Sequence, residues 1–151
     1  MPTHDFLLLP EKDGHYSDYV RYINDPNALR VDDDLVVYIQ DTLNWIPTIN
    51  PANPVEWGGY GLNYYGPTVI NKAGAAKMAR IFHLWAALLQ EGPKDVKLRG
   101  GYEWTEGETS SGGRYAVITA PRDSVVKTFR AIAALAEQAA SGKFYVLHLG
   151  V

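Results

Sequence analysis

The stretch NKAGAAKMARIFHLWAALLQEGP, residues 71–93, carries the clearest secondary-structure pattern in the chain. Its large apolar residues recur at steps of three and four, so they share one face of a helix; they are Met78, Ile81, Phe82, Trp85, Leu88 and Leu89. Asn71 can cap the first turn. Gly92-Pro93 is a typical stop, because glycine admits a left-handed residue and proline cannot continue a helix. The pattern predicts a long amphipathic helix over residues 72–90.

Two strands are predicted immediately after this helix. Residues 96–99 and 102–105 indicate one strand interrupted or bulged at Gly100-Gly101. Residues 106–113 are polar and rich in glycine and serine, and residues 114–119 return as a second strand. Together they predict an antiparallel hairpin.

A second amphipathic helix and a last strand close the chain. Pro121 with Asp123 or Ser124 opens the helix, and Gly142 ends it. Its apolar stripe consists of Val125, Phe129, Ile132, Leu135 and Ala139. Residues 144–149 are almost continuously apolar, which predicts a strand at the centre of a sheet.

The first seventy residues are less regular. Residues 6–9, closed by Pro10, predict an edge strand or an extended arm, and residues 16–23 have the apolar spacing of a short helix. Asp32, Asp33 and Asp34 precede residues 35–46, whose spacing favours a helix. Acids at its start suit the positive end of the helix dipole. Residues 47–54 contain three prolines and two asparagines, so we expect an irregular, exposed segment. Residues 68–70 predict a short strand.

These elements predict one α+β domain over residues 1–151. A small, mostly antiparallel sheet packs against two long helices, with helical segments toward the N-terminus. We find no internal repeat and no linker that would divide the chain.

Composition narrows the classes of function. The formal net charge is -3 and the pI is near 5.7, whereas nucleic-acid binders usually carry a basic stripe. The chain has no cysteine, which excludes disulfides and thiol chemistry. No apolar run is long enough for a membrane span, and the N-terminus lacks the pattern of a signal peptide. We therefore expect a cytoplasmic protein that contacts neither nucleic acid nor membrane.

No catalytic constellation stands out among the motifs. His83 lies beside the apolar stripe of the long helix and His148 in the last strand, so the two could meet as an acid–base or metal pair. Two unrelated structural histidines are the simpler interpretation, because no ligand spacing accompanies either. His4 and His15 are expected at the surface. Glu56 and Glu103 could supply a glycosidase pair only if the fold brought them together. We expect no catalytic residue, no metal and no cofactor.

Aromatic residues dominate residues 57–70, which read WGGYGLNYYGPTVI. The rings either form a small satellite core or present a binding face of the residue types enriched at interface hot spots. Acidic side chains suit a basic partner. The expected partner-binding residues are Asp32, Asp33, Asp34, Trp57, Tyr60, Asn63, Tyr64 and Tyr65.

Four features together carry a resemblance: residues 45–51 (WIPTINP), residues 61–70 (GLNYYGPTVI), a helix with Trp85 before Gly92-Pro93, and the ending YVLHLG at 145–150. In this set the chain resembles small bacterial immunity proteins of toxin–immunity pairs, including polymorphic toxin and contact-dependent inhibition systems. The resemblance implies a cytoplasmic inhibitor that covers or distorts the active site of a cognate toxin domain, which in some systems is a basic nuclease.

Three interpretations of function follow. The first is an immunity-type inhibitor that acts by stoichiometric protein binding and not as an enzyme. The second is a small hydrolase-like enzyme that uses His83 or His148 with a nearby carboxylate. The third is a ligand-binding module whose tyrosines stack on a sugar or a base.

Overall fold

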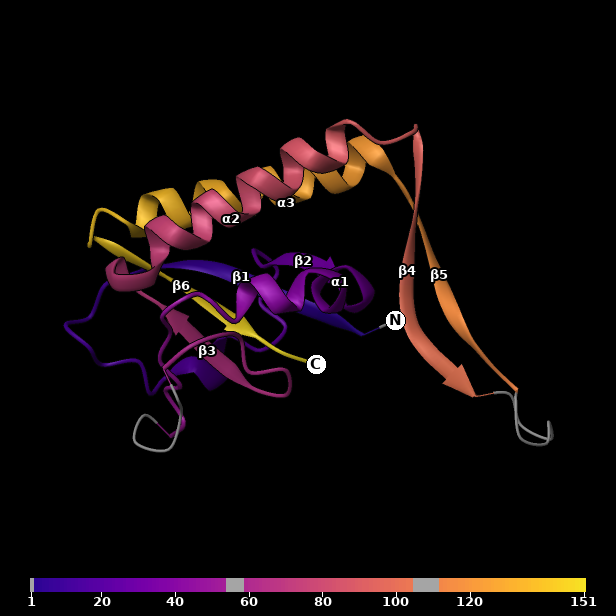
Figure 1. Cartoon of the computed structure of the whole chain (residues 1–151). Helices are drawn as coiled ribbons and strands as arrows, with labels where there is room; N and C mark the ends of the chain where they lie inside the picture. The colour runs from indigo at the N-terminus through magenta and orange to yellow at the C-terminus, as the bar shows by residue number, and fades with distance from the viewer. Residues whose placement is uncertain (1, 54–58, 105–111) are drawn as a thin grey trace.

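A four-stranded antiparallel sheet and a pair of long helices form the two main layers of the molecule (Figure 1). The computed structural model describes residues 2–53, 59–104 and 112–151. In chain order the elements are β1 (Thr3–Pro10), a 3-10 helix η1 (Tyr19–Tyr22), β2 (Leu29–Asp32), α1 (Asp33–Leu43), β3 (Pro67–Ile70), α2 (Lys72–Gln90), β4 (Asp95–Trp104), β5 (Gly113–Pro121), α3 (Arg122–Ala139) and β6 (Phe144–Leu149). This arrangement confirms the α+β class.

The last strand is central in the main sheet, as its apolar run predicts. The strand order is β2-β1-β6-β3, and residues 145–148 are buried. The prediction of an edge strand for residues 6–9 holds only in part. β2 pairs with β1 from Thr3–Asp32 to Phe6–Leu29, whereas residues 7–9 pair with β6 and not with β2. β2 is absent from the sequence prediction because four residues beside a run of aspartates are too few for an alternation to be recognised.

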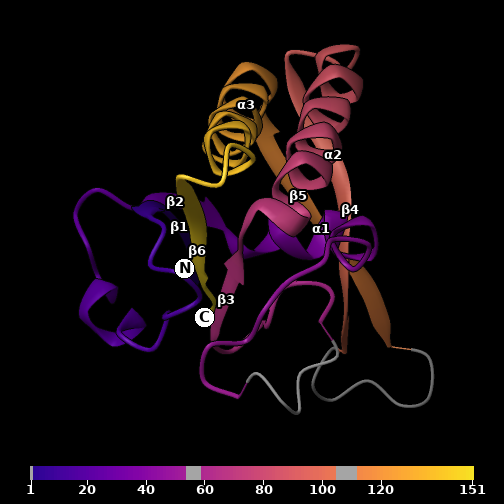
Figure 2. The ribbon, with the colours of Figure 1, turned by 90° about the vertical axis from the view of Figure 1, so that its left-hand side faces the viewer.

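Helices α2 and α3 lie side by side over one face of this sheet (Figure 2). α2 begins and ends at the predicted residues, and the Asn71 side chain accepts a hydrogen bond from the Ala73 N–H at 3.0 Å. Its buried stripe is narrower than predicted, because Leu88 is exposed and Trp85 only half-buried. Phe6, Ile39, Phe82, Phe129, Ile132 and Val146 belong to the main core between the layers.

Helix α1 begins where the aspartates predict. The Asp32 side chain accepts a hydrogen bond from the Asp34 N–H at 3.0 Å and so caps the helix. The helix ends at Leu43, before the predicted end at Ile46. The helix expected over residues 16–23 is also wrong, since only the 3-10 helix Tyr19–Tyr22 forms. The spacing of Tyr16, Tyr19 and Tyr22 instead turns their rings onto the second face of the main sheet, against Tyr145.

Within the segment predicted over residues 47–54, the described residues 47–53 are less exposed than expected. Thr48 and Asn50 are buried, because Ile49 and Val69 exchange two backbone hydrogen bonds of 2.9 and 2.8 Å. This proline-rich chain therefore runs beside β3, which is confirmed as a strand.

Strands β4 and β5 form a separate hairpin that connects the end of α2 to the start of α3 (Figure 1). The register shifts between Arg99 and Tyr102, which confirms the predicted bulge. Near the helices Val96 and Ile118 are buried, whereas most residues beyond the bulge are exposed. Helix α1 contacts β4 and lies between the hairpin and the main sheet. Within the described residues, no helix combines the length and the apolar character of a membrane span.

Candidate functional site

The outer part of the hairpin carries a cluster of exposed apolar side chains, which we call the aromatic face: Tyr102, Trp104, Tyr115 and Val117. Tyr102 lies opposite Tyr115 in register, and Trp104 and Val117 are each two positions away along their strands. Residues two apart on a strand point to the same side. Trp104 is 77% exposed and Val117 67% exposed.

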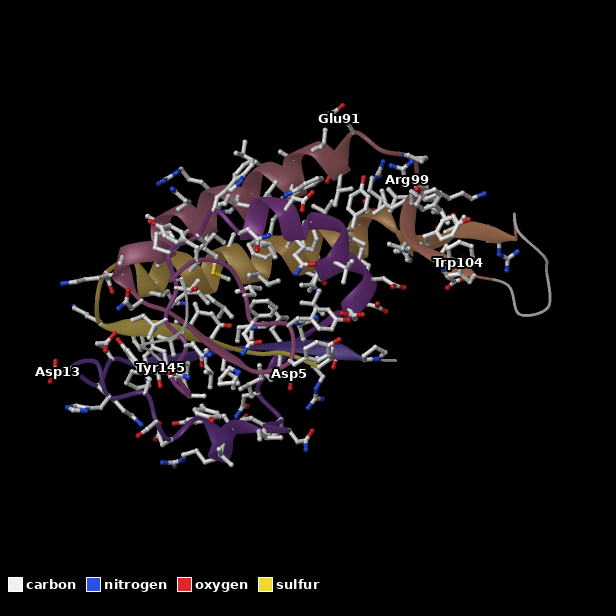
Figure 3. All side chains as sticks on the ribbon, turned by 60° about the horizontal axis from the view of Figure 1, so that its bottom comes forward. Asp5, Asp13, Glu91, Arg99, Trp104 and Tyr145 are labelled. Carbon is white, nitrogen blue, oxygen red and sulfur yellow. The ribbon has the colours of Figure 1, made fainter. Side chains whose placement is uncertain are left out.

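The rings of the aromatic face pack against one another, and this packing restricts their orientation. Tyr102 packs edge-on against both Trp104 and Tyr115, with ring centroids 5.1 Å apart in each case. The Arg99 guanidinium lies 4.8 Å from the centre of the Tyr115 ring, within the range of a cation–π contact. Figure 3 shows that Arg99 and Trp104 both come from the hairpin, whereas Asp5 and Tyr145 come from the main sheet.

Acidic side chains lie between the hairpin and α1. Partial desolvation of its carboxyl group raises the pKa of Asp34, and the charges of Asp32, Asp33 and Glu103 raise it further. Negative charge therefore gathers at the start of α1, while Glu103 lies opposite Arg114 in the hairpin. A cation brought by a partner would relieve the repulsion.

The three aspartates expected to bind a partner have three different environments. Asp32 caps α1, and Asp34 is exposed. Asp33 lies mostly inside, with 15% of its side chain exposed, and its two carboxylate oxygens contact His4 and Tyr64.

The expected residues of the aromatic loop are also divided. Tyr60 and Tyr65 are exposed, the latter by 80%. Asn63 shapes the turn, because its side-chain oxygen accepts a hydrogen bond from the Tyr65 N–H at 3.2 Å. The Tyr64 hydroxyl is bound to Asp33, and Trp57 lies outside the described residues.

A chain of hydrogen-bonded polar side chains, which we call the histidine relay, starts on β3 and runs across β6 and β1 to the start of α1. Its members are Thr68, His148, His4, Asp33 and Tyr64. Thr68 Oγ1 lies 3.4 Å from His148 Nδ1, His148 Nε2 2.8 Å from His4 Nδ1, and His4 Nε2 2.9 Å from Asp33 Oδ1. The Tyr64 hydroxyl donates to Asp33 Oδ2 at 2.8 Å. The expectation that His4 lies at the surface is wrong, since it is fully buried.

The carboxylate sets the direction of the hydrogen bonds that it receives. Asp33 can only accept, so His4 Nε2 and the Tyr64 hydroxyl both donate to it. When His4 is neutral, its Nδ1 accepts from His148 Nε2, and His148 Nδ1 then accepts from the Thr68 hydroxyl. Burial, and then the neighbouring His4, hold the pKa of His148 well below its usual range. The hydrogen bond to Asp33 raises the pKa of Tyr64 to about 12.

The relay resembles a catalytic triad in chemistry but not in access. Thr68, His4 and His148 are all fully buried, so a substrate has no route to the hydroxyl or the imidazoles. A buried network in which each group has a partner rigidifies a core and specifies its packing. We therefore interpret the relay as part of the architecture.

The other proposed chemistries find little geometric support. His83 contacts Glu137 on α3, whereas His148 contacts His4, so the fold does not pair His83 with His148. Glu56 lies outside the described residues, so its pairing with Glu103 has no geometry here. Across residues 2–53, 59–104 and 112–151, no group of three or more His, Cys, Asp or Glu side chains could hold a metal ion.

Sequence reasoning missed the aromatic face and half of the relay. The signal for the first was present, since apolar residues alternate at 102 and 104 and again at 115 and 117. The signal for the second was not, because His4 and His148 are 144 positions apart. In comparisons with known proteins, no family model matches the chain, and neither a curated protein nor a solved structure matches it.

Proposed function

We propose that this protein is a cytoplasmic immunity-type inhibitor that binds a cognate bacterial toxin domain one to one and neutralises it by contact. The observation that carries the proposal is the aromatic face, which stands on a hairpin away from the main sheet (Figure 1). We infer that this face is the centre of the contact.

The composition of the face supports protein binding. Trp, Tyr and Arg are the residue types most enriched among interface hot spots, and Trp104, Tyr102, Tyr115 and Arg99 supply all three. Their mutual packing already restricts the rings. Little side-chain entropy then remains to be lost when a partner binds.

The low stability expected of a two-stranded hairpin also supports protein binding. A lone two-stranded hairpin is at best marginally stable in water, and beyond the bulge the apolar residues of this one are exposed. A partner that covers the face would bury those side chains and stabilise the outer hairpin together with the complex.

The neighbouring carboxylates favour a basic partner. Asp34 at the start of α1 and Glu103 on β4 are exposed, and the charges of Asp32, Asp33 and Glu103 already act on Asp34. Opposite charge at the rim of an apolar contact speeds association and selects the partner. A basic toxin domain, such as a nuclease, fits this requirement.

Isothermal titration calorimetry with the C-terminal domain of the protein encoded immediately upstream tests the proposal. We expect a one-to-one complex at micromolar concentration. Trp104→Ala and Tyr115→Ala should each weaken binding about thirtyfold or more, corresponding to about 2 kcal/mol. Leu84→Ala is the matched control, because Leu84 is an equally exposed apolar residue on α2. It should change the affinity less than twofold.

Two results would contradict the proposal in different ways. Absence of a complex would reject the inhibitor function. A complex weakened by Tyr60→Ala or Tyr65→Ala but not by the hairpin variants would place the contact on the loop, and the aromatic face would lose its role.

A further inference from the structure

A cavity of about 390 Å³ opens on the second face of the main sheet, beside the 3-10 helix that contributes Tyr19 to its lining. β1 and β2 supply its charged side chains, Asp5 and Arg30. Tyr19, Ile23, Pro67 and Leu149 provide apolar surface, and the exposed ring of Tyr65 stands at its edge. The volume lies within the range of small-ligand sites.

One wall of the cavity is preformed by backbone contacts. Gly150 N–H donates to the Gly66 carbonyl at 3.0 Å, and Val151 N–H to the Tyr64 carbonyl at 2.9 Å. A Cβ at Gly150 would overlap the Tyr64 carbonyl group, so only glycine permits this approach. The turn over residues 63–66 is therefore held against the end of the chain, and the wall exists before any ligand arrives.

The Asp5 carboxylate has unused hydrogen-bonding capacity. Its side chain is only 13% exposed, and its Oδ1 atom is buried without a hydrogen bond from any described residue. Its ion contact is with Arg30 Nε, 3.5 Å from Oδ1. Nearly buried carboxylates are almost always hydrogen-bonded. Oδ1 itself is covered, so a donor in the cavity reaches this carboxylate through the remaining exposed part of the side chain.

The Arg30 guanidinium also makes few hydrogen bonds with the described residues. Its guanidinium is half exposed, and besides the contact with Asp5 it makes one long hydrogen bond, from Nη2 to the Asp25 carbonyl at 3.5 Å. A guanidinium carries five N–H donors in a planar fork that matches a carboxylate. Positive and negative groups therefore lie side by side in one wall of the cavity.

From this pairing we infer that the cavity binds a small zwitterion of the α-amino-acid class with an apolar side chain. The ligand ammonium contacts Asp5, its carboxylate contacts Arg30, and its side chain packs against Tyr19, Ile23 and Leu149. In an α-amino acid the two charged groups are one carbon apart, which matches two opposite charges 3.5 Å apart. A ligand with one charge engages only one of the two protein groups.

Titration of the ¹⁵N-labelled full chain with three probes by NMR tests this inference. The probes are L-phenylalanine, phenethylamine, which lacks the carboxylate, and 3-phenylpropionate, which lacks the ammonium. L-Phenylalanine should bind with a dissociation constant of about 1 mM or tighter and shift the amides of Arg30, Tyr65, Gly66 and Gly150. Each single-charge probe should bind at least about tenfold more weakly.

Two variants locate the charges. Asp5→Asn and Arg30→Gln preserve side-chain shape and should each weaken L-phenylalanine binding by about tenfold or more. Asp123→Asn and Arg130→Gln are matched controls at exposed positions outside the cavity and should leave the affinity unchanged. The three-probe comparison uses the parent chain, so it stands even if a variant folds poorly.

Three outcomes would overturn the inference: no saturable shift with L-phenylalanine, equal affinity for a single-charge probe, or shifts confined to residues outside the cavity. None of them bears on the aromatic face. Conversely, loss of toxin binding in Trp104→Ala would leave this site intact.

Discussion

Two hydrogen bonds converge on the carboxylate of Asp33, one from a buried imidazole and one from a phenol. The next residue, Asp34, has the same side chain but is exposed and repelled by its neighbours. Asp33 therefore makes hydrogen bonds inside the protein, whereas the adjacent Asp34 lies at the surface.

Substitution of these two aspartates should separate the two roles. Asp33→Asn should lower the free energy of unfolding by about 2–3 kcal/mol, because His4 and Tyr64 lose a charged acceptor. Asp34→Asn should change it by less than about 0.5 kcal/mol. Urea unfolding at pH 7 measures both values. Equal losses in the two variants would contradict the assignment of Asp33 to the relay.

His148 should make the stability dependent on pH. Its pKa is well below the ordinary value in the folded state because it is buried beside His4. The unfolded chain therefore takes up a proton at this residue near pH 6.5, whereas the folded chain resists it. The unfolded state binds more protons below that pH, so the free energy of unfolding should fall as the pH drops from about 6.5.

Two variants isolate this effect in urea titrations at several pH values. His148→Gln removes the group that titrates, so the dependence on pH should flatten. Thr68→Val removes only the hydroxyl that faces His148 Nδ1, so it should lower stability yet keep the slope. An unchanged slope in His148→Gln would show that other groups cause the dependence.

At the scale of elements, the packing of α2 requires a glycine in its first turn, and the helical sequence pattern does not explain this glycine. Gly74 lies in the first turn, where a Cβ would overlap the backbone carbonyl of Pro47 and approach Ile46. The close approach allows the chain after α1 to run across the start of α2. Glycine is otherwise unfavourable in a helix by about 1 kcal/mol relative to alanine.

Alanine at position 74 should therefore destabilise the protein despite its helix propensity. Gly74→Ala should lower the free energy of unfolding by about 1–3 kcal/mol through overpacking. Ala76→Gly, at an exposed position on the same helix, should lower it by about 1 kcal/mol for the opposite reason. Thermal or urea unfolding measures both, and a more stable Gly74→Ala would show that Pro47 does not constrain this turn.

For the molecule as a whole, the proposed function makes charge a determinant of association rate. The net charge is -3. Asp34 lines a hollow with Arg99 and Tyr115 of the aromatic face, and Glu103 lies on the same strand as Tyr102 and Trp104 but points to its other side. The double variant Asp34→Lys/Glu103→Lys should slow association with a basic toxin domain by about tenfold at low salt. Stopped-flow fluorescence at two ionic strengths measures the rate. A rate unaffected by the variant and by salt would argue against a basic partner.

The whole fold also shows which elements can be predicted from the residue pattern of their own segment. α2, the bulged hairpin and the central β6 could be predicted, because each has a full period of apolar residues or a glycine–proline boundary within its own segment. β2 and the segment over residues 16–23 could not, because their conformation follows from what they pack against. β2 completes the sheet beside β1, and the tyrosines of the other segment cover Tyr145.

The same division holds for the candidate sites. The aromatic face lies on two strands joined in one hairpin, so its alternation was visible in the amino-acid order. The relay and the cavity combine β1 and β6 with distant turns, as His4 with His148 and Asp5 with Leu149 illustrate. The sequence by itself determined the long helices, the hairpin and the α+β class, because these depend on periodicity over neighbouring residues. Only the tertiary structure decided which histidines meet, which aspartate is interior and where a cavity opens, because those depend on the pairing of strands from opposite ends of the chain.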